Sequence, residues 1–123
     1  MAGPGDAIVT IAEQHDEHGC HVALRGRLDV HTAADLRLSL HRVIAQGTTP
    51  LLLDLGEAHV GDATGFGLIV ECQRRAHRAG RNMVVVAADD RTRRLLRRAR
   101  LGSLLRTSAA PAASARVLAV APA

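Results

Sequence analysis

A threonine, Thr64, lies between an acid and a glycine in the segment Asp62-Ala63-Thr64-Gly65. Ahead of this segment, Leu51-Leu52-Leu53 is a short apolar run without alternation, which is typical of a strand buried on both faces. Beyond the segment the apolar residues follow helical spacing, at Phe66, Ile69, Val70 and Ala76. Thr64 is therefore expected where a buried strand passes through a polar turn into a helix, the edge at which open α/β sheets usually carry functional groups.

The chemistry that this position favours is phosphorylation of the Thr64 hydroxyl. The first N–H groups of a helix have no intrahelical partner and carry the positive end of the helix dipole, so they can hold a phosphate without lysine or arginine. Asp62 could orient the metal of a phosphoryl donor, or repel a phosphate once it is attached. Small neighbours allow close backbone approach: Gly61, Ala63, Gly65 and Gly67. The alternative is structural: Asp62 or Thr64 caps the helix and the glycines form the turn.

The segment from Leu53 to Leu68 resembles the signature of STAS domains, and specifically of the bacterial anti-sigma factor antagonists. In that family a buried strand ending in Asp-Leu leads to Asp-Ser-Ser-Gly or Asp-Ser-Thr-Gly, and then to Leu-Gly at the start of a helix. The second hydroxyl of that motif is the phosphorylated one, and Thr64 occupies its position. Ala63 replaces the first hydroxyl, and Gly61 replaces a usually large apolar residue. The resemblance fails only at the two ends of the chain.

The resemblance implies a cytoplasmic protein switch. Without phosphate, the surface around Thr64 would bind an anti-sigma factor that is itself a serine/threonine kinase, and a sigma factor would be freed for transcription. Phosphorylation would add about −1.5 to −2 charges to that surface and release the partner, and a phosphatase would reset the switch. The partner-binding loop would comprise the neighbours of Thr64 and one acid of another strand: Asp29, Gly61, Asp62, Ala63, Gly65, Phe66 and Gly67.

The acid Asp29 enters this loop through a second resemblance. Gly26-Arg27-Leu28-Asp29 is similar to the family's Gly-Glu-Leu-Asp, which ends a strand beside the phosphorylated loop. Asp29 is therefore expected to be a second acid near Thr64, or else a turn residue ahead of a helix. Arg27 replaces the family's usual acid, and we expect it to alter the local charge and the choice of partner.

Strands and helices alternate along the chain, which predicts a single α/β domain of order β-β-α-β-α-β-α-β with helices packed on a mostly parallel sheet. The strands are expected at 8–12, 21–28, from 51, at 82–88 and at 104–107, with a hairpin connection at 13–19. The helices are expected after a capping box at Thr32-Ala33-Ala34-Asp35, after Thr64, and over 90–101. The first of these helices is expected to bury Leu36, Leu40, Val43 and Ile44. Residues 7–107 would be the STAS domain, 1–6 a flexible N-terminus, and 108–123 an Ala- and Pro-rich tail whose residues 113–120 suit a short helix.

Composition excludes several partners. The 123 residues are 47% apolar, Phe66 is the only aromatic, and every basic residue is arginine. Proteins that bind single-stranded nucleic acid stack its bases on aromatic side chains, of which this chain has only one. The arginines between 91 and 100 follow helical spacing and indicate a solvated helix face, so we expect no nucleic-acid partner. No run of apolar residues reaches membrane-spanning length, so we expect no membrane association. The two cysteines, Cys20 and Cys72, form no CxxC motif, and we expect both to be reduced in the cytoplasm. A free-standing switch is expected to be a monomer or weak dimer.

Four metal-ligand residues lie within seven positions: His15, His18, Cys20 and His21. Strand alternation places Cys20 and His21 on opposite faces, and no second cluster completes a coordination shell, so the prediction is a solvated hairpin without a metal. Walker, GxGxxG, GxSxG and HExxH motifs are absent, and we expect neither enzymatic activity nor a cofactor. The alternative function is a constitutive STAS scaffold subunit of a stress-signalling or transport assembly, with Thr64 only a helix cap.

Overall fold

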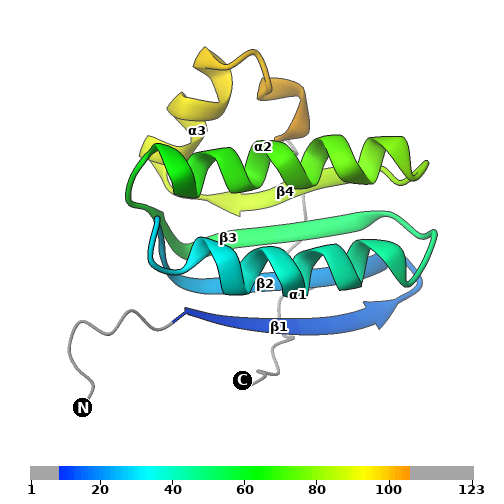
Figure 1. Ribbon diagram of the computed structural model, residues 1–123. Helices are drawn as coiled ribbons and strands as arrows, with labels where there is room; N and C mark the ends of the chain where they lie inside the picture. The colour runs from blue at the N-terminus through cyan, green and yellow to red at the C-terminus, as the bar shows by residue number, and fades with distance from the viewer. Residues whose placement is uncertain (1–8, 106–123) are drawn as a thin grey trace.

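The computed structural model describes residues 9–105, coloured in Figure 1. In chain order the elements are β1 (Val9–Asp16), β2 (Gly19–Leu28), α1 (Ala33–Ala45), β3 (Leu51–Val60), α2 (Ala63–Arg78), β4 (Met83–Ala88), α3 (Asp90–Arg98) and the 3-10 helix η1 (Gly102–Leu104). The predicted N-terminal segment 1–6 and the predicted tail 108–123, with its short helix, lie outside the described residues.

The four strands form one sheet in the order β1-β2-β3-β4. β1 runs antiparallel to β2, whereas β2, β3 and β4 are parallel to one another. Figure 1 shows α1 and α2 side by side across one face of the sheet, with α3 and η1 beyond its β4 edge. This arrangement confirms the predicted α/β fold with a mostly parallel sheet. It also brings the carboxyl ends of β2 and β3 to the edge where α2 begins.

The core lies between the sheet and the pair α1 and α2. As the helical spacing predicts, α1 turns Leu36, Leu40, Val43 and Ile44 into it. Of the apolar positions predicted for α2, Ile69 and Ala76 are buried and Phe66 and Val70 are half-buried, while Leu68 and Cys72 complete the buried face. The run Leu51-Leu52-Leu53 is buried throughout, which confirms a strand covered on both faces. Each fully buried leucine contributes roughly 1.5–3 kcal/mol to folding, so this packing fixes the sheet edge that carries Thr64.

Three strands, β1, β2 and β3, extend further than predicted. The polar turn expected after Leu53 is instead the second half of β3, which pairs with β2 as far as Leu28 and Val60. Gly56 and Glu57 interrupt the apolar pattern, yet Leu55, Ala58 and Val60 are buried. β1 likewise extends through polar residues to Asp16, because cross-strand pairing with β2 continues there, and the hairpin connection shrinks to residues 17 and 18.

The predicted final strand at 104–107 is replaced, in its described part, by η1 and a single bridge. Leu105 pairs with Val85 in parallel, and the three residues before it form the 3-10 turn. Residues 106 and 107 of that predicted strand lie outside the described range. No helix among residues 9–105 combines the length and the apolar character that a membrane span requires.

Candidate functional site

Thr64 is the second residue of α2 and is exposed to solvent. It follows directly from β3, at the carboxyl end of the sheet, and its neighbours Ala63 and Gly67 are also exposed. A residue in the first helical turn has a backbone N–H without an intrahelical acceptor. The hydroxyl is thus both accessible and close to the positive end of the helix dipole. We call residues 61–67 the Thr64 loop.

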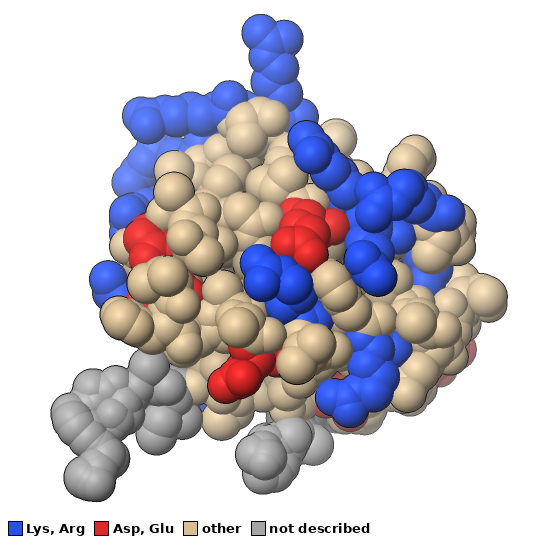
Figure 2. Space-filling view, in the orientation of Figure 1, with Lys and Arg blue, Asp and Glu red and all other residues tan. Residues whose placement is uncertain are grey.

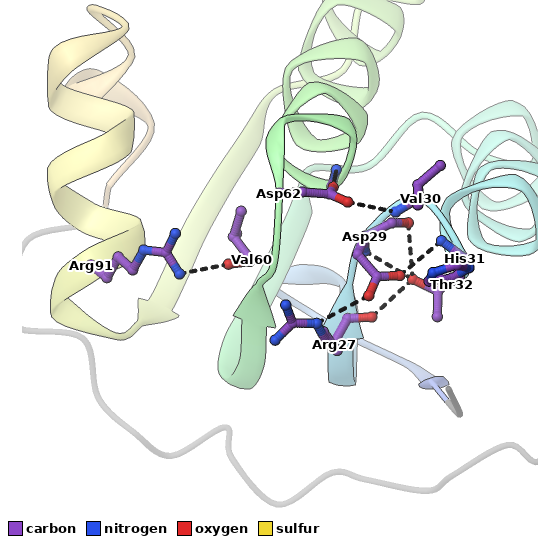
Figure 3. A network of polar contacts seen from close by, with 9 residues as sticks. Arg27, Asp29, Val30, His31, Thr32, Val60, Asp62 and Arg91 are labelled. Carbon is purple, nitrogen blue, oxygen red and sulfur yellow. Dashed lines mark hydrogen bonds and ion pairs between the residues drawn. The ribbon is translucent and has the colours of Figure 1, made fainter. Parts of the chain in front are cut away.

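Asp62 is the N-cap of α2, and its carboxylate joins the Thr64 loop to the connection between β2 and α1. One oxygen, Oδ1, accepts a hydrogen bond of 2.9 Å from the N–H of Gly65, and Oδ2 accepts one of 3.0 Å from the N–H of Val30. The bond to Val30 is drawn in Figure 3. The Gly65 bond lowers the pKa of the Asp62 carboxyl below its ordinary value, with burial opposing and the Val30 bond adding to the decrease. Asp62 is therefore ionised at neutral pH, and Thr64 is not the cap.

Gly65 is the position at which α2 touches β2. A Cβ atom on Gly65 would overlap the carbonyl oxygen of Leu28, and that same oxygen accepts a hydrogen bond of 2.8 Å from the N–H of Gly61. A Cβ atom on Gly67 would have no described atom within 4 Å, apart from its own chain neighbours and helix backbone. Phe66 is half-buried and packs against the core. Close approach thus explains Gly65 but not Gly67.

Asp29 lies at the end of β2 and is buried, in the same connection that Asp62 binds. Its carboxylate accepts from the N–H of His31 at 2.8 Å and from Nε of Arg27 at 3.0 Å. The Thr32 hydroxyl donates to the carbonyl of Arg27 at 2.8 Å and accepts from the N–H of Asp29 at 3.1 Å, as Figure 3 shows. Asp29 is thus brought to the predicted edge, where its carboxylate holds the connection together.

The predicted capping box at the start of α1 is wrong. Thr32 does occupy the N-cap position, but its side chain makes no cap hydrogen bond. The physical reason is that the buried hydroxyl is engaged with the backbone of the β2–α1 connection. The same interaction stabilises the loop that receives the Asp62 carboxylate.

Two arginines lie beside the Thr64 loop: Arg27, which the sequence placed near it, and Arg91, which the sequence assigned only to the solvated face of a helix. A Cβ atom on Gly61 would lie 2.7 Å from Nε of Arg27, so the guanidinium of Arg27 covers the backbone of Gly61. Arg91, on α3, donates from Nη1 to the carbonyl of Val60 at 2.9 Å. Figure 3 shows the two arginines on opposite sides of the end of β3. The signal that could have paired Arg27 with Gly61 was that both residues depart from the family pattern.

Most of the other arginines lie away from this loop. Figure 2 shows blue side chains gathered over α3 and over the C-terminal part of α2. Besides Arg91, the exposed ones on these helices are Arg74, Arg75, Arg78, Arg94, Arg97 and Arg98. Their exposure confirms the predicted solvated arginine face on α3, and α2 carries a second one. Arg75 and Arg78 of α2 and Arg97 and Arg98 of α3 lie in the last turns, where cations interact favourably with the helix dipole.

A family model described as the STAS domain matches residues 10–113. The chain belongs to the STAS domain family. This STAS domain is similar to the unphosphorylated form of the anti-sigma factor antagonist SpoIIAA, with 17% identity and a TM-score of 0.65 over 80% of this chain and 88% of that one.

Two further structures share the fold of this STAS domain. The phosphorylated form of the Bacillus cell fate determinant SpoIIAA is 20% identical, with a TM-score of 0.63 over 80% of this chain and 91% of that chain. An anti-sigma factor antagonist from Mycobacterium paratuberculosis is 21% identical, with a TM-score of 0.68 over 80% of this chain and 83% of that chain. These likenesses confirm the predicted fold class.

Proposed function

We propose that this STAS domain is an anti-sigma factor antagonist controlled by phosphorylation of Thr64. With a free hydroxyl it binds an anti-sigma factor that is a serine/threonine kinase, and the sigma factor is released. The kinase then phosphorylates Thr64 and the complex dissociates, until a phosphatase removes the phosphate. The domain itself acts as a binding protein. The observation that carries this proposal is the exposed hydroxyl of Thr64 in the first turn of α2, between two firmly held residues.

Rigidity on both sides of Thr64 supports the proposal. The Asp62 carboxylate binds two backbone N–H groups, and Gly65 packs directly against Leu28. A side chain presented on such a fixed turn keeps one position relative to a docked kinase. Because Thr64 is not the N-cap, the loop is complete without its hydroxyl, which leaves that hydroxyl available for a modification.

Charge gives the switch its direction. A phosphate on Thr64 would lie beside the ionised carboxylate of Asp62, and it would carry about −1.5 to −2 charges into the partner interface. Burying that charge without a cationic partner costs several kcal/mol, and about 5.5 kcal/mol suffices to move a two-state equilibrium from 1:99 to 99:1. Arg27 and Arg91 lie next to the loop, so they would attract the phosphate in the free, phosphorylated domain. When Thr64 is unmodified, the same two guanidinium groups would attract an acidic surface of the partner.

An exposed apolar residue beside the loop, Val30, is a candidate contact for that partner. Val30 is 59% exposed, and its N–H donates to the carboxylate of Asp62. An apolar contact beside a charge-sensitive hydroxyl suits an interface that must form and dissociate. We include Val30 with the Thr64 loop in the binding surface.

The test is incubation of the domain with ATP and the anti-sigma factor kinase encoded nearest to its gene, followed by intact-mass measurement. We expect one phosphoryl group on the wild type and on Thr64→Ser, and none on Thr64→Ala. Thr48→Ala, which changes another exposed threonine, is the matched control and should be modified like the wild type. An unmodified wild type, or a phosphoryl group that survives Thr64→Ala, would overturn the proposal.

A further inference from the structure

The β1–β2 hairpin brings three metal-binding side chains together at the end of the sheet opposite to Thr64. In the hairpin register His15 lies directly across from Cys20, and Glu13 lies two residues before His15 on the same face. Nε2 of His15 is 3.0 Å from Oε2 of Glu13 and 3.8 Å from Sγ of Cys20. Sγ of Cys20 is 4.0 Å from the same Glu13 oxygen.

We propose that Glu13, His15 and Cys20 form a zinc-binding site. Zinc takes imidazole, thiolate and carboxylate ligands at about 2.0–2.3 Å, so neighbouring ligand atoms of a tetrahedral site lie roughly 3.3–3.8 Å apart. The three distances bracket these values to within a few tenths of an ångström. All three ligand atoms lie within 4.8 Å of one another, and no large movement of the backbone is needed to close them around an ion.

The structure keeps His15 and Cys20 of the four residues that the chain spacing suggested, and it replaces His18 and His21 by Glu13. His21 points to the opposite face of the sheet, where it binds Asp16 at 3.0 Å, and His18 approaches Glu17 at 3.8 Å. Strand alternation was thus correctly applied to Cys20 and His21. What it missed is that hairpin pairing adds Glu13 and His15 from the neighbouring strand to the face of Cys20.

Burial and backbone geometry suit a bound ion. Cys20 is fully buried, whereas the side chains of Glu13 and His15 are 37% and 65% exposed, so an ion can enter from the solvent side onto a protected sulfur. The N–H of Cys20 donates to the carbonyl of Pro50 at 2.9 Å, which holds the ligand in place. As the zinc–sulfur bond forms, the thiol proton leaves to solvent. Three protein ligands leave a fourth position open to water or to a ligand from another molecule.

Charges around the thiol act in both directions. Burial and then the negative charge of Glu13 raise the pKa of the Cys20 thiol above its ordinary value, while Arg81 opposes them. The guanidinium of Arg81 repels a cation, and its hydrogen bonds to the carbonyls of Val43, Ile44 and Thr49 hold it in place. The Glu13 carboxylate and the thiolate supply two negative charges against the two positive charges of zinc.

The first test titrates zinc chloride into untagged, reduced and chelator-treated protein by calorimetry. We expect one ion per chain in the wild type and an affinity about 100-fold lower in His15→Ala. His18→Ala removes a similarly exposed histidine of the same hairpin and should bind like the wild type. Because His15 is exposed, its variant keeps the fold, which far-ultraviolet circular dichroism verifies.

The second test replaces zinc with cobalt(II) and follows the thiolate-to-cobalt charge-transfer absorption. The band should appear in the wild type and in Cys72→Ala and be lost in Cys20→Ala. Cys72 is the matched control because it is buried in the core, where burial raises the pKa of its thiol to about 12. A wild type that binds no stoichiometric zinc, or binding that His15→Ala and Cys20→Ala leave unchanged, overturns the site. Thr64→Ala should bind zinc normally, so this inference stands or falls independently of the phosphorylation switch.

Discussion

Gly65, in the first turn of α2, touches the carbonyl group of Leu28 at the end of β2, with no room for a side chain between them. The N–H of Gly61 binds the same carbonyl oxygen. Two backbone segments 37 positions apart are thereby locked together next to Thr64. This contact fixes where the threonine lies relative to the sheet. The three glycines of the loop differ in the space around them: Gly65 meets backbone, Gly61 meets the side chain of Arg27, and Gly67 meets nothing within 4 Å among the described atoms.

Alanine substitutions at these glycines should have three different effects on the free energy of unfolding, measured in urea. Gly65→Ala should lose about 3 kcal/mol or more, because the new methyl group meets backbone that cannot move aside. Gly61→Ala should lose less than about 1 kcal/mol, because only the flexible end of Arg27 must shift. Gly67→Ala should gain about 0.5–1 kcal/mol by restricting the unfolded chain. Equal stability of the Gly65 and Gly61 variants would show that the close approach is wrong.

Thr64→Asp separates a switch from a constitutive scaffold. A carboxylate in the first turn of α2 is favourable to the helix dipole, so the unfolding free energy should stay within about 0.5 kcal/mol of the wild type. Binding to the anti-sigma factor should weaken about 100-fold or more, because like charges then face each other across the interface. Calorimetry measures the binding, and Thr64→Ser is the control that keeps it. A constitutive scaffold would bind the partner equally well as wild type, Thr64→Ser and Thr64→Asp.

The Asp62 carboxylate predicts how stability depends on pH. Its folded-state pKa lies below the ordinary value of 3.8, chiefly through the Gly65 N–H bond, so its contribution is complete above that value and is lost as the pH falls through the folded-state pKa. The melting temperature of Asp62→Ala should therefore lie furthest below that of the wild type near neutral pH. The difference should shrink below about pH 4.

Asp62→Asn is the control for this pH dependence. It keeps one cap acceptor for Gly65 but offers no second carboxylate oxygen to the N–H of Val30. Its melting temperature should lie between those of the wild type and Asp62→Ala at neutral pH. A gap between wild type and Asp62→Ala that stays constant to the lowest pH would contradict the carboxylate's role.

Arg81 predicts a large effect far from the Thr64 loop. Its guanidinium is buried and donates to the carbonyls of Val43 and Ile44, which end α1, and to Thr49. Arg81→Met keeps most of the volume but leaves these acceptors without donors, and we expect a loss of about 2–4 kcal/mol in urea unfolding. Arg78→Met, at an exposed position nearby, should stay within about 0.5 kcal/mol. Similar losses in both variants would contradict this assignment.

Local pattern was sufficient for the fold. Helical spacing identified the buried face of α1 from Leu36 to Ile44, and the apolar run at Leu51 identified the central strand, because burying those side chains dominates the folding free energy. The end of β3 was not predictable in this way. Gly56 and Glu57 interrupt the apolar pattern, and the strand continues there because the pairing with β2 resumes at Glu57 after a register shift that leaves Gly56 without a partner in β2.

By itself, the sequence determined the order of the elements as far as α3 and the family motif around Thr64, since both depend on residues close together in the chain. Whether Thr64 is phosphorylated stays a prediction. The tertiary structure decided which side chains meet: Arg27 over Gly61, Arg91 on Val60, and Glu13 and His15 beside Cys20. These encounters depend on strand register and on the packing of α3, which many distant contacts set together, and chain spacing alone carries no such information.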